Sequence, residues 1–419
     1  MIVAINNLNG IGHEGKIPWH DKEDLRYFNY MTSKCPHGKN ALIVGRKTYE
    51  SMPKLGSSRK MFVVSGSRTL EMALKDAKED PEIYEIFVIG GKSIYDQAEK
   101  FPELANLYIT RIDDNTHCDR IYVPNLNSFN CLKGGKYQHW IRNSAYGEQG
   151  YLLLLREVLE NGTHFEGRNG PTVSLFGRHL EFNLLDGFPL LTTKRMFWRG
   201  IAEELLFFIR GETNSKLLEK KGINIWKANT SKSFLKARGL DYEEGEMGPM
   251  YGYQWRHYGN SNFDQLADVV AKLRNDSGSR RILMTTFNPA DVERSVLAPC
   301  HGIVTQFNVD GKYLDLIMYQ RSADAFLGLP FNIASYSLLL MIVAHATGYH
   351  ARRVRIDIGN VHIYKEHMDA CKIQIARIPR NLPFCRILCD PKEVDEYTFA
   401  DFELVDYDYC KPIKAKMIA

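Results

Sequence analysis

The sequence predicts two domains of different fold class, an α/β domain followed by a larger α+β domain. The chain has 419 residues, more than a single compact core usually holds. Short apolar runs alternate with helical segments in the first part, whereas the second part mixes long apolar helices with a strand pair. A stretch rich in Asn, Gly and Ser separates the two parts, so we expect domains at 1–133 and 151–419 and a linker at 134–150.

Five apolar runs predict the strands of the first domain. Such continuous runs are typical of strands buried on both faces, which indicates a mostly parallel sheet with helices on both sides. Helices are expected at 21–32 and 69–79, between the strands. The runs are MIVAI (1–5), ALIVG (41–45), KMFVVSG (60–66), EIFVIGG (85–91) and NLYITRI (106–112).

The second domain opens with the predicted helix YLLLLREVLENG (151–162), which Gly162 would cap. The segment 302–322 is predicted to form two strands around the turn VDGK. The longest apolar run, 336–346, is about half of what a bilayer requires and is expected to be a buried helix. Two further helices are expected at 202–211 and 263–276.

Composition narrows the functional classes. The formal net charge is only +4, which argues against a dedicated nucleic-acid-binding protein and leaves room for local basic pockets. The N-terminus lacks the basic flank and long apolar core of a signal peptide. The eight cysteines form no regular framework, and Cys385 and Cys389 have no second pair or nearby histidine for zinc. We expect a reduced, cytoplasmic protein without metal or membrane contact.

Cys300, in the stretch VLAPCHGIVTQF (296–307), is the first candidate for chemistry. Cations favour the thiolate that a cysteine nucleophile requires. The same half contains the pair Arg280 and Arg281, and also Arg321 followed by Ser322. Paired arginines can clamp a phosphate, although salt bridges and an inert buried thiol are the alternative reading of these residues alone.

Residues 151–419 resemble thymidylate synthase. The resemblance rests on the ordered stretches DGFPLLTTKR, EELLFFIRGETN, GPMYGYQWRHYG, LAPCHG, YQRSADAFLGLPFNIASYSLL and HIYKEHM. It implies that Cys300 attacks C6 of dUMP, that C5 takes the methylene of methylenetetrahydrofolate, and that hydride transfer from the folate gives dTMP and dihydrofolate. It also implies a homodimer in which Arg280 and Arg281 reach the site of the partner subunit.

The resemblance assigns further roles residue by residue. Glu204 would order waters for proton transfer, and Tyr251 would lie on the path that removes the C5 proton. Asn332 would read the uracil edge, because its amide both donates and accepts. Asp324 would meet the pterin ring, and Lys194 the glutamate tail of the folate. The residues expected around dUMP are Arg168, Arg280, Arg281, His301, Gln320, Arg321, Ser322, Asp324, Asn332, His362 and Tyr364, of which His362 and Tyr364 would hold the ribose hydroxyl.

Three positions depart from that family. The phosphate loop around Arg168 is one residue shorter than the family's pattern before Ser174, and Phe287 stands where the family commonly has Trp. Asn360 follows Gly359 where the family has Asp, two positions before His362. None of the three removes a residue of the reaction core.

The first part of the chain, roughly residues 1–125, resembles dihydrofolate reductase. The resemblance is carried by IVAINNLNGIGHEGKIPWHDKEDLRYF, ALIVGRKTYESMP, FVIGGKSIY and LYITRID. Taken alone, Asp24 between Lys22 and Arg26 would read as an exposed helix acid. The resemblance implies instead that it pairs with the pteridine and assists protonation. Folate would be bound by Ile2, Ala4, Trp19, Asp24, Phe28, Arg59 and Thr110, with Lys194 and Asp324 binding folate in the synthase half.

The cofactor implied is NADPH. Arg46, Ser65 and Arg68 offer the charge and hydroxyl that a 2′-phosphate requires, and a strand followed by a helix N-terminus suits a phosphate. Gly90 and Gly91 let the backbone approach the nicotinamide. The full expected set is Ala4, Gly45, Arg46, Lys47, Thr48, Ser65, Arg68, Gly90, Gly91, Ser93 and Tyr95.

The first domain is short for its family. One strand is expected to be missing between Ser65 and Gly90, and the stretch after DRIYVPNL shows little sign of a closing strand pair. Either the sheet edge is truncated there, or the segment 125–150 replaces the missing strands. The leading prediction is a bifunctional enzyme, since some protist and plant enzymes carry both activities in this order. The alternatives are a synthase whose reductase-like domain is weak or inactive and serves as a folate-binding or dimer-supporting module, and a non-enzymatic binder such as an RNA-binding protein.

Overall fold

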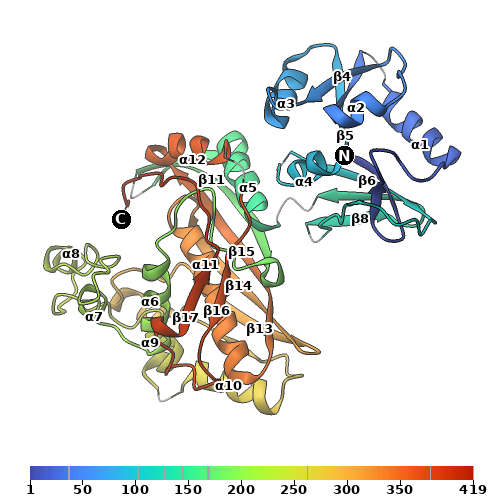
Figure 1. Cartoon of the computed structure of the whole chain (residues 1–419). Helices are drawn as coiled ribbons and strands as arrows, with labels where there is room; N and C mark the ends of the chain where they lie inside the picture. The colour runs from blue at the N-terminus through green and yellow to red at the C-terminus, as the bar shows by residue number, and fades with distance from the viewer. Residues whose placement is uncertain are drawn as a thin grey trace. The chain divides into compact units, whose positions relative to one another are not determined.

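Two units make up the chain, residues 1–144 and 145–419, shown from blue to green and from green to red in Figure 1. The computed structural model describes residues 1–418 except 36–37, 102, 127, 143–145, 168–169, 262 and 378. The predicted α/β and α+β classes are confirmed.

The first unit is built on parallel strands. β3 (Lys39–Gly45) lies between β4 (Arg59–Val64) and β5 (Ile83–Gly90), parallel to both. β1 (Ile2–Asn6) pairs in parallel with β6 (Asn106–Ile112) and lies against β5. The remaining elements are β2 (Gly10–Gly12), β7 (Arg120–Ile121), α1 (Lys22–Ser33), α2 (Arg46–Ser51), α3 (Leu70–Glu79) and α4 (Lys92–Ala98).

Helices cover both faces of these strands, as predicted. Side chains alternate between faces along a strand. Leu42 and Phe87 pack with residues of α1 on one face, together with Met52 just after α2, whereas Ile43 and Val88 pack with α3 and α4 on the other. Because both faces are buried, consecutive strand residues must all be apolar, which explains the continuous runs in the sequence.

The expected truncation of the sheet edge was wrong, and the alternative, that the segment 125–150 supplies the closing strands, is confirmed. β8 (Phe129–Lys133) and β9 (Tyr137–Arg142) form an antiparallel pair, and β9 also pairs with β6, giving the order β1-β6-β9-β8. β9 and the start of α5 therefore occupy the predicted linker. Both strands are short and only partly apolar, and Gly134 and Gly135 between them form the turn. Pairing with neighbouring strands stabilises β8 and β9, and the local sequence pattern did not indicate this.

Along the chain, no strand lies between β4 and β5 in the structure. Residues 65–82 are all described, and the only regular element among them is α3. β4 therefore forms the edge of the β4-β3-β5 sheet.

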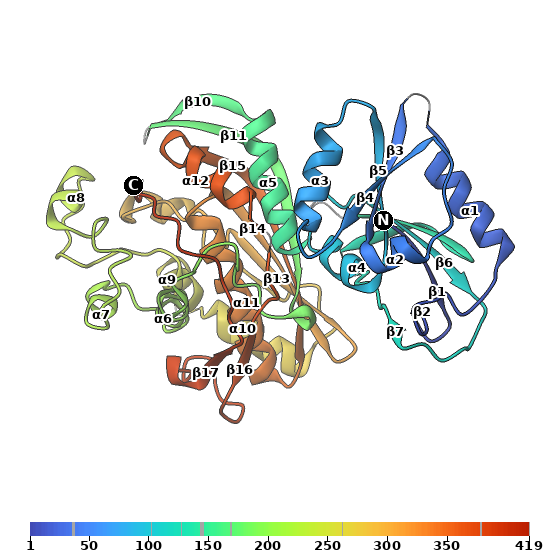
Figure 2. The same cartoon turned by 45° about the horizontal axis from the view of Figure 1, so that its top comes forward.

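The second unit is organised around a six-stranded sheet of order β10-β11-β15-β14-β13-β12, in which only β14 and β15 are parallel. Figure 2 shows the β10–β11 hairpin at one end of this sheet. The strands are β10 (Thr163–Gly167), β11 (Gly170–Asn183), β12 (Leu283–Met284), β13 (Val304–Asp310), β14 (Tyr313–Asp324) and β15 (His350–Tyr364), with a separate pair β16 (Phe384–Ile387) and β17 (Phe402–Val405).

One face of the six-stranded sheet carries the helical core. α11 (Gly328–Thr347) packs against β14 and β15 and is almost wholly buried, so the predicted buried helix is confirmed. It is also the one described helix long and apolar enough to cross a membrane by length and composition. The other helices of at least four residues are α5 (Gly147–Asn161), α6 (Trp198–Ile209), α7 (Lys216–Glu219), α8 (Lys232–Ala237), α9 (Gly252–Arg256), α10 (Gln265–Asn275) and α12 (Met368–Ile375), with short 3-10 turns such as η4 (Lys365–His367).

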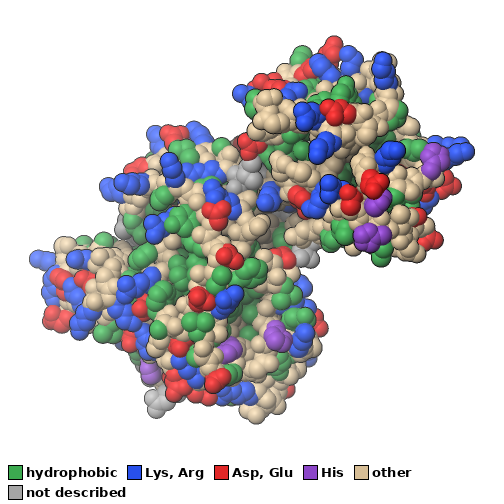
Figure 3. All heavy atoms as spheres, viewed as in Figure 1, with side chains coloured by type: hydrophobic (Ala, Val, Ile, Leu, Met, Phe, Trp, Pro, Cys, Tyr) green, Lys and Arg blue, Asp and Glu red, His purple; other side chains and the backbone are tan. Residues whose placement is uncertain are grey.

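The surface of each unit mixes both signs of charge. Figure 3 shows Lys and Arg side chains interspersed with Asp and Glu over the visible face of both units.

Candidate functional site

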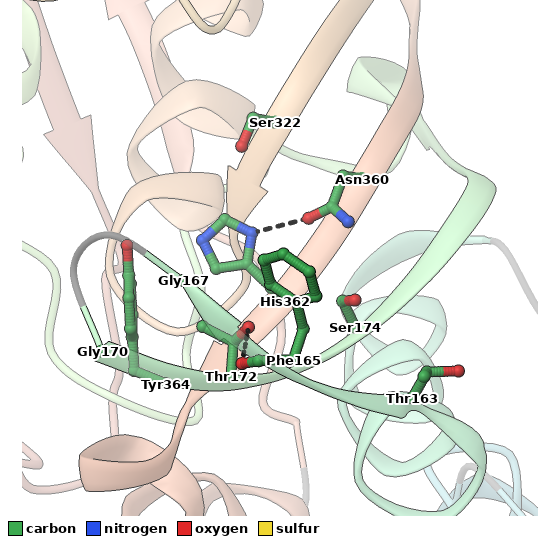
Figure 4. Close-up of a pocket in the computed structure, with 10 residues that line it drawn as sticks. All are labelled: Thr163, Phe165, Gly167, Gly170, Thr172, Ser174, Ser322, Asn360, His362 and Tyr364. Atoms are coloured by element: carbon green, nitrogen blue, oxygen red, sulfur yellow. Dashed lines mark hydrogen bonds between the residues drawn. The ribbon is translucent and has the colours of Figure 1, made fainter.

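A cavity of about 460 Å³ opens beside the ends of β14 and β15 in the second unit (Figure 4). Three residues predicted to bind the nucleotide, Ser322, His362 and Tyr364, lie along it. The β10–β11 hairpin forms the facing wall. The complete lining is Thr163, Phe165, Gly167, Gly170, Thr172, Ser174, Ser322, Asn360, His362 and Tyr364. Arg168, predicted to reach the phosphate from this hairpin, lies outside the described residues.

Cys300 lies in the loop before β13, fixed by two neighbours. The hydroxyl of Tyr251 lies 3.4 Å from the Cys300 sulfur and accepts a 3.1 Å hydrogen bond from the Cys300 backbone N–H. Arg321 donates through its side chain to the carbonyls of Pro299 and Ala298, at 2.7 and 2.9 Å, and through its backbone to that of Cys300. Arg321 thus braces the loop that presents the thiol.

Neighbouring groups act on the pKa of the Cys300 thiol in opposite directions. Burial raises the pKa of its thiol, whereas the Tyr251 hydrogen bond and the Arg321 charge lower it, and Glu204 is close enough to raise it. The net direction is upward, so the resting side chain is a thiol. Arg321 and Tyr251 are the groups that favour the thiolate once the proton leaves.

Tyr251 is held in a sparsely populated backbone conformation. Its φ is 44°, which costs on the order of 1–3 kcal/mol for a residue with a Cβ. The ring stacks on Phe208 and on His301, at centroid distances of 5.0 and 4.4 Å, and this packing holds it in place. The conformation aims the hydroxyl at Cys300.

Glu204, on α6, is the strongest candidate for proton transfer in this unit. Burial raises the pKa of its carboxyl to about 7, and the indole N–H of Trp226 donates a 2.7 Å hydrogen bond that favours the ionised form. A carboxyl with that pKa exchanges protons near neutral pH. Trp226 was not predicted from the sequence, because a lone Trp outside the matched stretches carried no signal.

Asn332 and His301 are fixed by buried hydrogen bonds. Gln320 donates to the amide oxygen of Asn332 at 2.9 Å, which leaves the Asn332 N–H₂ group to donate elsewhere. His301 Nδ1 lies 3.0 Å from the hydroxyl of Tyr336, and burial lowers the pKa of His301 to about 3. His301 is therefore neutral.

Two predicted folate residues of this unit lie close together. An oxygen of Asp324 accepts the backbone N–H groups of Phe326 and Leu327 at 3.0 and 3.3 Å. Lys194 is buried, donates to the carbonyl of Phe326, and has its pKa lowered to about 8 by burial although Asp324 raises it. The structure thus places Lys194 beside Asp324, and its contact with a glutamate tail stays a prediction.

Arg280 and Arg281 do not line the cavity beside β14 and β15. Both are exposed, in the turn between α10 and β12.

Asp24 lies in the first turn of α1, in the first unit. Asp21 caps this helix by accepting the N–H groups of Glu23 and Asp24, each at 2.9 Å. Burial raises the pKa of Asp24, and a hydrogen bond from Thr110 lowers it. Lys136, in the β8–β9 turn, pairs with Asp21 and Glu23 at 3.0 and 2.9 Å and ties that turn to the same helix. Lys136 was missed because its segment was read as a linker.

The other predicted folate residues surround α1. Arg59 donates to Asn29 and Thr32 of α1, at 2.9 and 3.1 Å, and Phe28 packs in the apolar cluster on the same face. The carbonyl of Ile2 accepts the hydroxyl of Tyr95 at 3.0 Å. Trp19, in the loop before α1, is half-buried, and Ala4 lies in β1.

Three glycines create a narrow space between the N-termini of α2 and α4. A Cβ on Gly91 would lie 3.1 Å from Thr48 Oγ1, and one on Gly45 would lie 3.2 Å from Ile94. Gly90 has φ 120°, and a Cβ there would lie 3.0 Å from the hydroxyl of Tyr95. Only glycine permits this approach of β3 and β5, which suits close backbone contact with a dinucleotide.

The predicted 2′-phosphate residues are near the surface. Arg46 is exposed, and Ser65 lies 3.2 Å from Ser67. Arg68 forms an ion pair with Asp76 of α3 and stacks over Phe62, so it would have to exchange a carboxylate for a phosphate. Lys47 and Ser93 belong to the first turns of α2 and α4. Among the described residues, no three His, Cys, Asp or Glu side chains gather as metal ligands would.

These two sites define the chain as an enzyme with a folate-dependent nucleotide site in one unit and a dinucleotide site in the other. Residues 149–419 match the thymidylate synthase family, and residues 1–144 match the dihydrofolate reductase family. The whole chain aligns with bifunctional dihydrofolate reductase-thymidylate synthases, and it belongs to that family.

Three relatives illustrate the match, and each aligns with 100% of this chain. Identity is 37% to bifunctional dihydrofolate reductase-thymidylate synthase 2 of Arabidopsis thaliana, over 88% of that protein. It is 35% to the enzyme of Paramecium tetraurelia, over 98% of its length, and 34% to that of Leishmania amazonensis, over 94%.

Proposed function

We propose that the second unit converts dUMP to dTMP with methylenetetrahydrofolate and that the first unit reduces the resulting dihydrofolate with NADPH. The observation that carries the synthase assignment is the convergence of Tyr251 and Arg321 on Cys300, with Glu204 nearby. A nucleophile, a cation that favours its anion, and a carboxyl with a pKa near 7 together suit addition to C6 followed by proton removal at C5.

Binding of dUMP is assigned to the cavity of Figure 4 and its surroundings. His362 and Tyr364 would hold the ribose hydroxyl, and Ser322 the phosphate. Arg321, next to Ser322 in the sequence, would add positive charge for the phosphate. Asn332, oriented by Gln320, would read the uracil edge. Asp324 would meet the pterin.

For the reductase, NADPH would lie along the N-termini of α2 and α4, where the three glycines leave room for its backbone contacts. Bound there, NADPH supplies the hydride. Asp24 would hold the pteridine edge and retain a proton near the ring, because burial already raises its carboxyl pKa. Thr110 orients that carboxyl.

Replacement of Cys300 by alanine tests the synthase assignment. Cys300→Ala should abolish dTMP formation, by at least about a thousandfold, because no other group can form the bond to C6. Binding of dUMP should change little, and NADPH oxidation with dihydrofolate should continue. Cys131→Ser, at an exposed thiol, is the matched control. Residual dTMP formation within tenfold of the unmodified enzyme would overturn the assignment of the nucleophile.

A homodimer through the second unit is proposed from the outer face of its sheet. Leu283, Val304, Ile317 and Tyr319 are between 38% and 47% exposed, on the face opposite α11. Strand register pairs Val304 with Tyr319 and places Gln306 between Leu283 and Ile317. Four large apolar side chains exposed on one face of a sheet suit contact with a second copy of the chain.

Mixed dimers test this arrangement. If Arg281 serves the site of the partner subunit, mixing Arg281→Ala chains with Cys300→Ala chains should restore part of the activity, since one hybrid site keeps both residues. Absence of recovery after confirmed subunit exchange would contradict shared sites.

The protein is expected in the cytoplasm. The structure describes all eight cysteines and joins none of them in a disulfide, as expected in a reducing compartment.

A further inference from the structure

Asn360 makes a hydrogen bond at the edge of the nucleotide cavity that no role given so far explains. Its side-chain oxygen lies 3.0 Å from Nδ1 of His362, as the dashed line in Figure 4 shows. The two residues are two positions apart on β15, so their side chains stand on the same face of the strand. Both line the cavity.

The chemistry of this bond fixes the proton on the imidazole. An amide oxygen can only accept, so Nδ1 must carry hydrogen and donate to Asn360. A neutral imidazole has one N–H, and Nε2 therefore keeps a lone pair and accepts. Figure 4 shows the second ring nitrogen of His362 facing away from Asn360, toward the side of the cavity where Tyr364 stands.

The surroundings keep His362 neutral. Burial lowers its pKa, and the nearby His367 of η4 lowers it further, whereas Asp324 on β14 raises it. On the other side of β15, Ser174 of β11 lies opposite His362 in the strand register and brings no charge. Asn360 is likewise uncharged.

We propose that Asn360 is a positioning residue for the nucleotide, holding His362 as a neutral acceptor aimed at the ribose 3′-hydroxyl. The hydroxyl would donate to Nε2 of His362 and accept from Tyr364. This inference rests on the proposed binding of dUMP in the cavity. It assigns Asn360 a task distinct from contact with the substrate, since Asn360 acts through the ring of His362.

A carboxylate at position 360 would change the character of the site. It would favour the imidazolium, in which both ring nitrogens donate and neither accepts. The bound phosphate would add to that tendency. An amide gives the same geometry without the charge, so the hydrogen bond to the ribose hydroxyl would not depend on pH in the neutral range.

The first experiment removes the Asn360 side chain from the protein and the 3′-hydroxyl from the nucleotide. Dissociation constants are measured by calorimetry for dUMP and for 2′,3′-dideoxyuridine monophosphate, which lacks the 3′-hydroxyl. Asn360→Ala should weaken dUMP about tenfold and the dideoxy analogue less than about twofold. Asn275→Ala, at an exposed Asn at the end of α10 that bonds only its own helix, should change neither. Equal weakening of both ligands, or of neither, would overturn the proposal.

The second experiment places a carboxylate at position 360. With Asn360→Asp, the ratio of its dUMP dissociation constant to that of the unmodified enzyme should rise as the pH falls from about 8 to about 6, because His362 becomes protonated. Taking the ratio cancels the titration of the dUMP phosphate. In a His362→Gln background the same change should give a flat ratio. A flat or falling ratio with His362 present would contradict the acceptor assignment.

Failure of the proposed function is recognised separately. Both experiments measure binding, so an unmodified enzyme that binds dUMP without forming dTMP would refute the synthase activity and leave the role of Asn360 intact. If dUMP does not bind, nitrogen-15 NMR of the histidine-labelled protein still reports which ring nitrogen of His362 carries the proton. The His362 signal is assigned by its absence from the spectrum of His362→Gln. It should show the Nδ1–H tautomer, and Asn360→Ala should shift the tautomer equilibrium toward Nε2–H. An Nε2–H tautomer in the unmodified protein would refute the proposal.

Discussion

Glu204 and Asp24, the carboxyls proposed to transfer protons in the two units, are held in different ways. Glu204 projects from a helix that is buried along most of its length, and Trp226 from a distant segment bonds it directly. Asp24 lies in the first turn of an outer helix, whose start is tied to the β8–β9 turn by Lys136. The synthase site thus depends on core packing, and the reductase site on elements near the edge of its sheet.

Removing β9 should break the first unit more severely than any point substitution. β9 lies between β6 and β8, so a fragment ending at residue 133 leaves β8 without a partner and the edge of β6 uncovered. We expect fragment 1–133 to aggregate, because uncovered strand edges pair with other chains.

Fragment 1–146 keeps the strand pair and is the matched control. It should remain soluble and unfold cooperatively on heating. Equal solubility and equal melting temperatures for the two fragments would show that β9 contributes nothing to the first unit.

Asp24→Asn separates the two activities. Dihydrofolate reduction should fall by about 10²–10⁴-fold, because the amide cannot provide the proton, while dTMP formation remains within twofold. Loss of NADPH absorbance with dihydrofolate measures the first activity. Asp113→Asn, in an exposed loop of the same unit, is the control. If the unmodified enzyme binds NADPH and folate without turnover, the first unit is the inactive folate-binding module of the alternative prediction.

Glu204→Gln should lower dTMP formation about a hundredfold and remove an inflection near pH 7 from the pH dependence of kcat/KM for dUMP. The inflection arises because burial raises the carboxyl pKa to about 7, so the carboxyl ionises in the neutral range. A profile with the same inflection in the Gln variant would assign it to another group.

The same pKa predicts the effect on stability. The carboxyl has a pKa of 4.5 when unfolded and about 7 when folded, so the folded state binds more protons between these values and loses stability as the pH rises through them. The free energy of unfolding should fall by about 3 kcal/mol from this group alone. Glu204→Gln should therefore melt higher than the unmodified enzyme at pH 8, measured by calorimetry. A lower melting temperature there would contradict burial of the charge.

Trp226→Phe should have the smallest effect. It removes the hydrogen bond that favours ionised Glu204, so the carboxyl pKa should rise further and kcat/KM for dUMP at pH 7 should fall roughly 3–10-fold. A pH profile identical to that of the unmodified enzyme would show that the indole N–H does not act on Glu204.

The sequence predicted more of the synthase unit than of the reductase unit. Long ordered stretches singled out Cys300, Arg321 and Asn332 as candidates, and continuous apolar runs predicted the parallel strands of the first unit. β8 and β9 were missed because short, half-polar strands are stabilised by their neighbours, which a local pattern does not contain. The pairing of Trp226 with Glu204 and of Asn360 with His362 required coordinates, since no spacing rule relates one side chain to a particular atom of another.

The most direct test of both activities supplies dUMP, methylenetetrahydrofolate and NADPH together to the purified full chain. The synthase unit forms one dihydrofolate per dTMP, and an active reductase unit consumes one NADPH for each dihydrofolate. We expect NADPH oxidation and dTMP formation to proceed in a one-to-one ratio, and both to cease with Cys300→Ala. Accumulation of dTMP and dihydrofolate while NADPH stays constant would contradict the claim that both units of this chain are active.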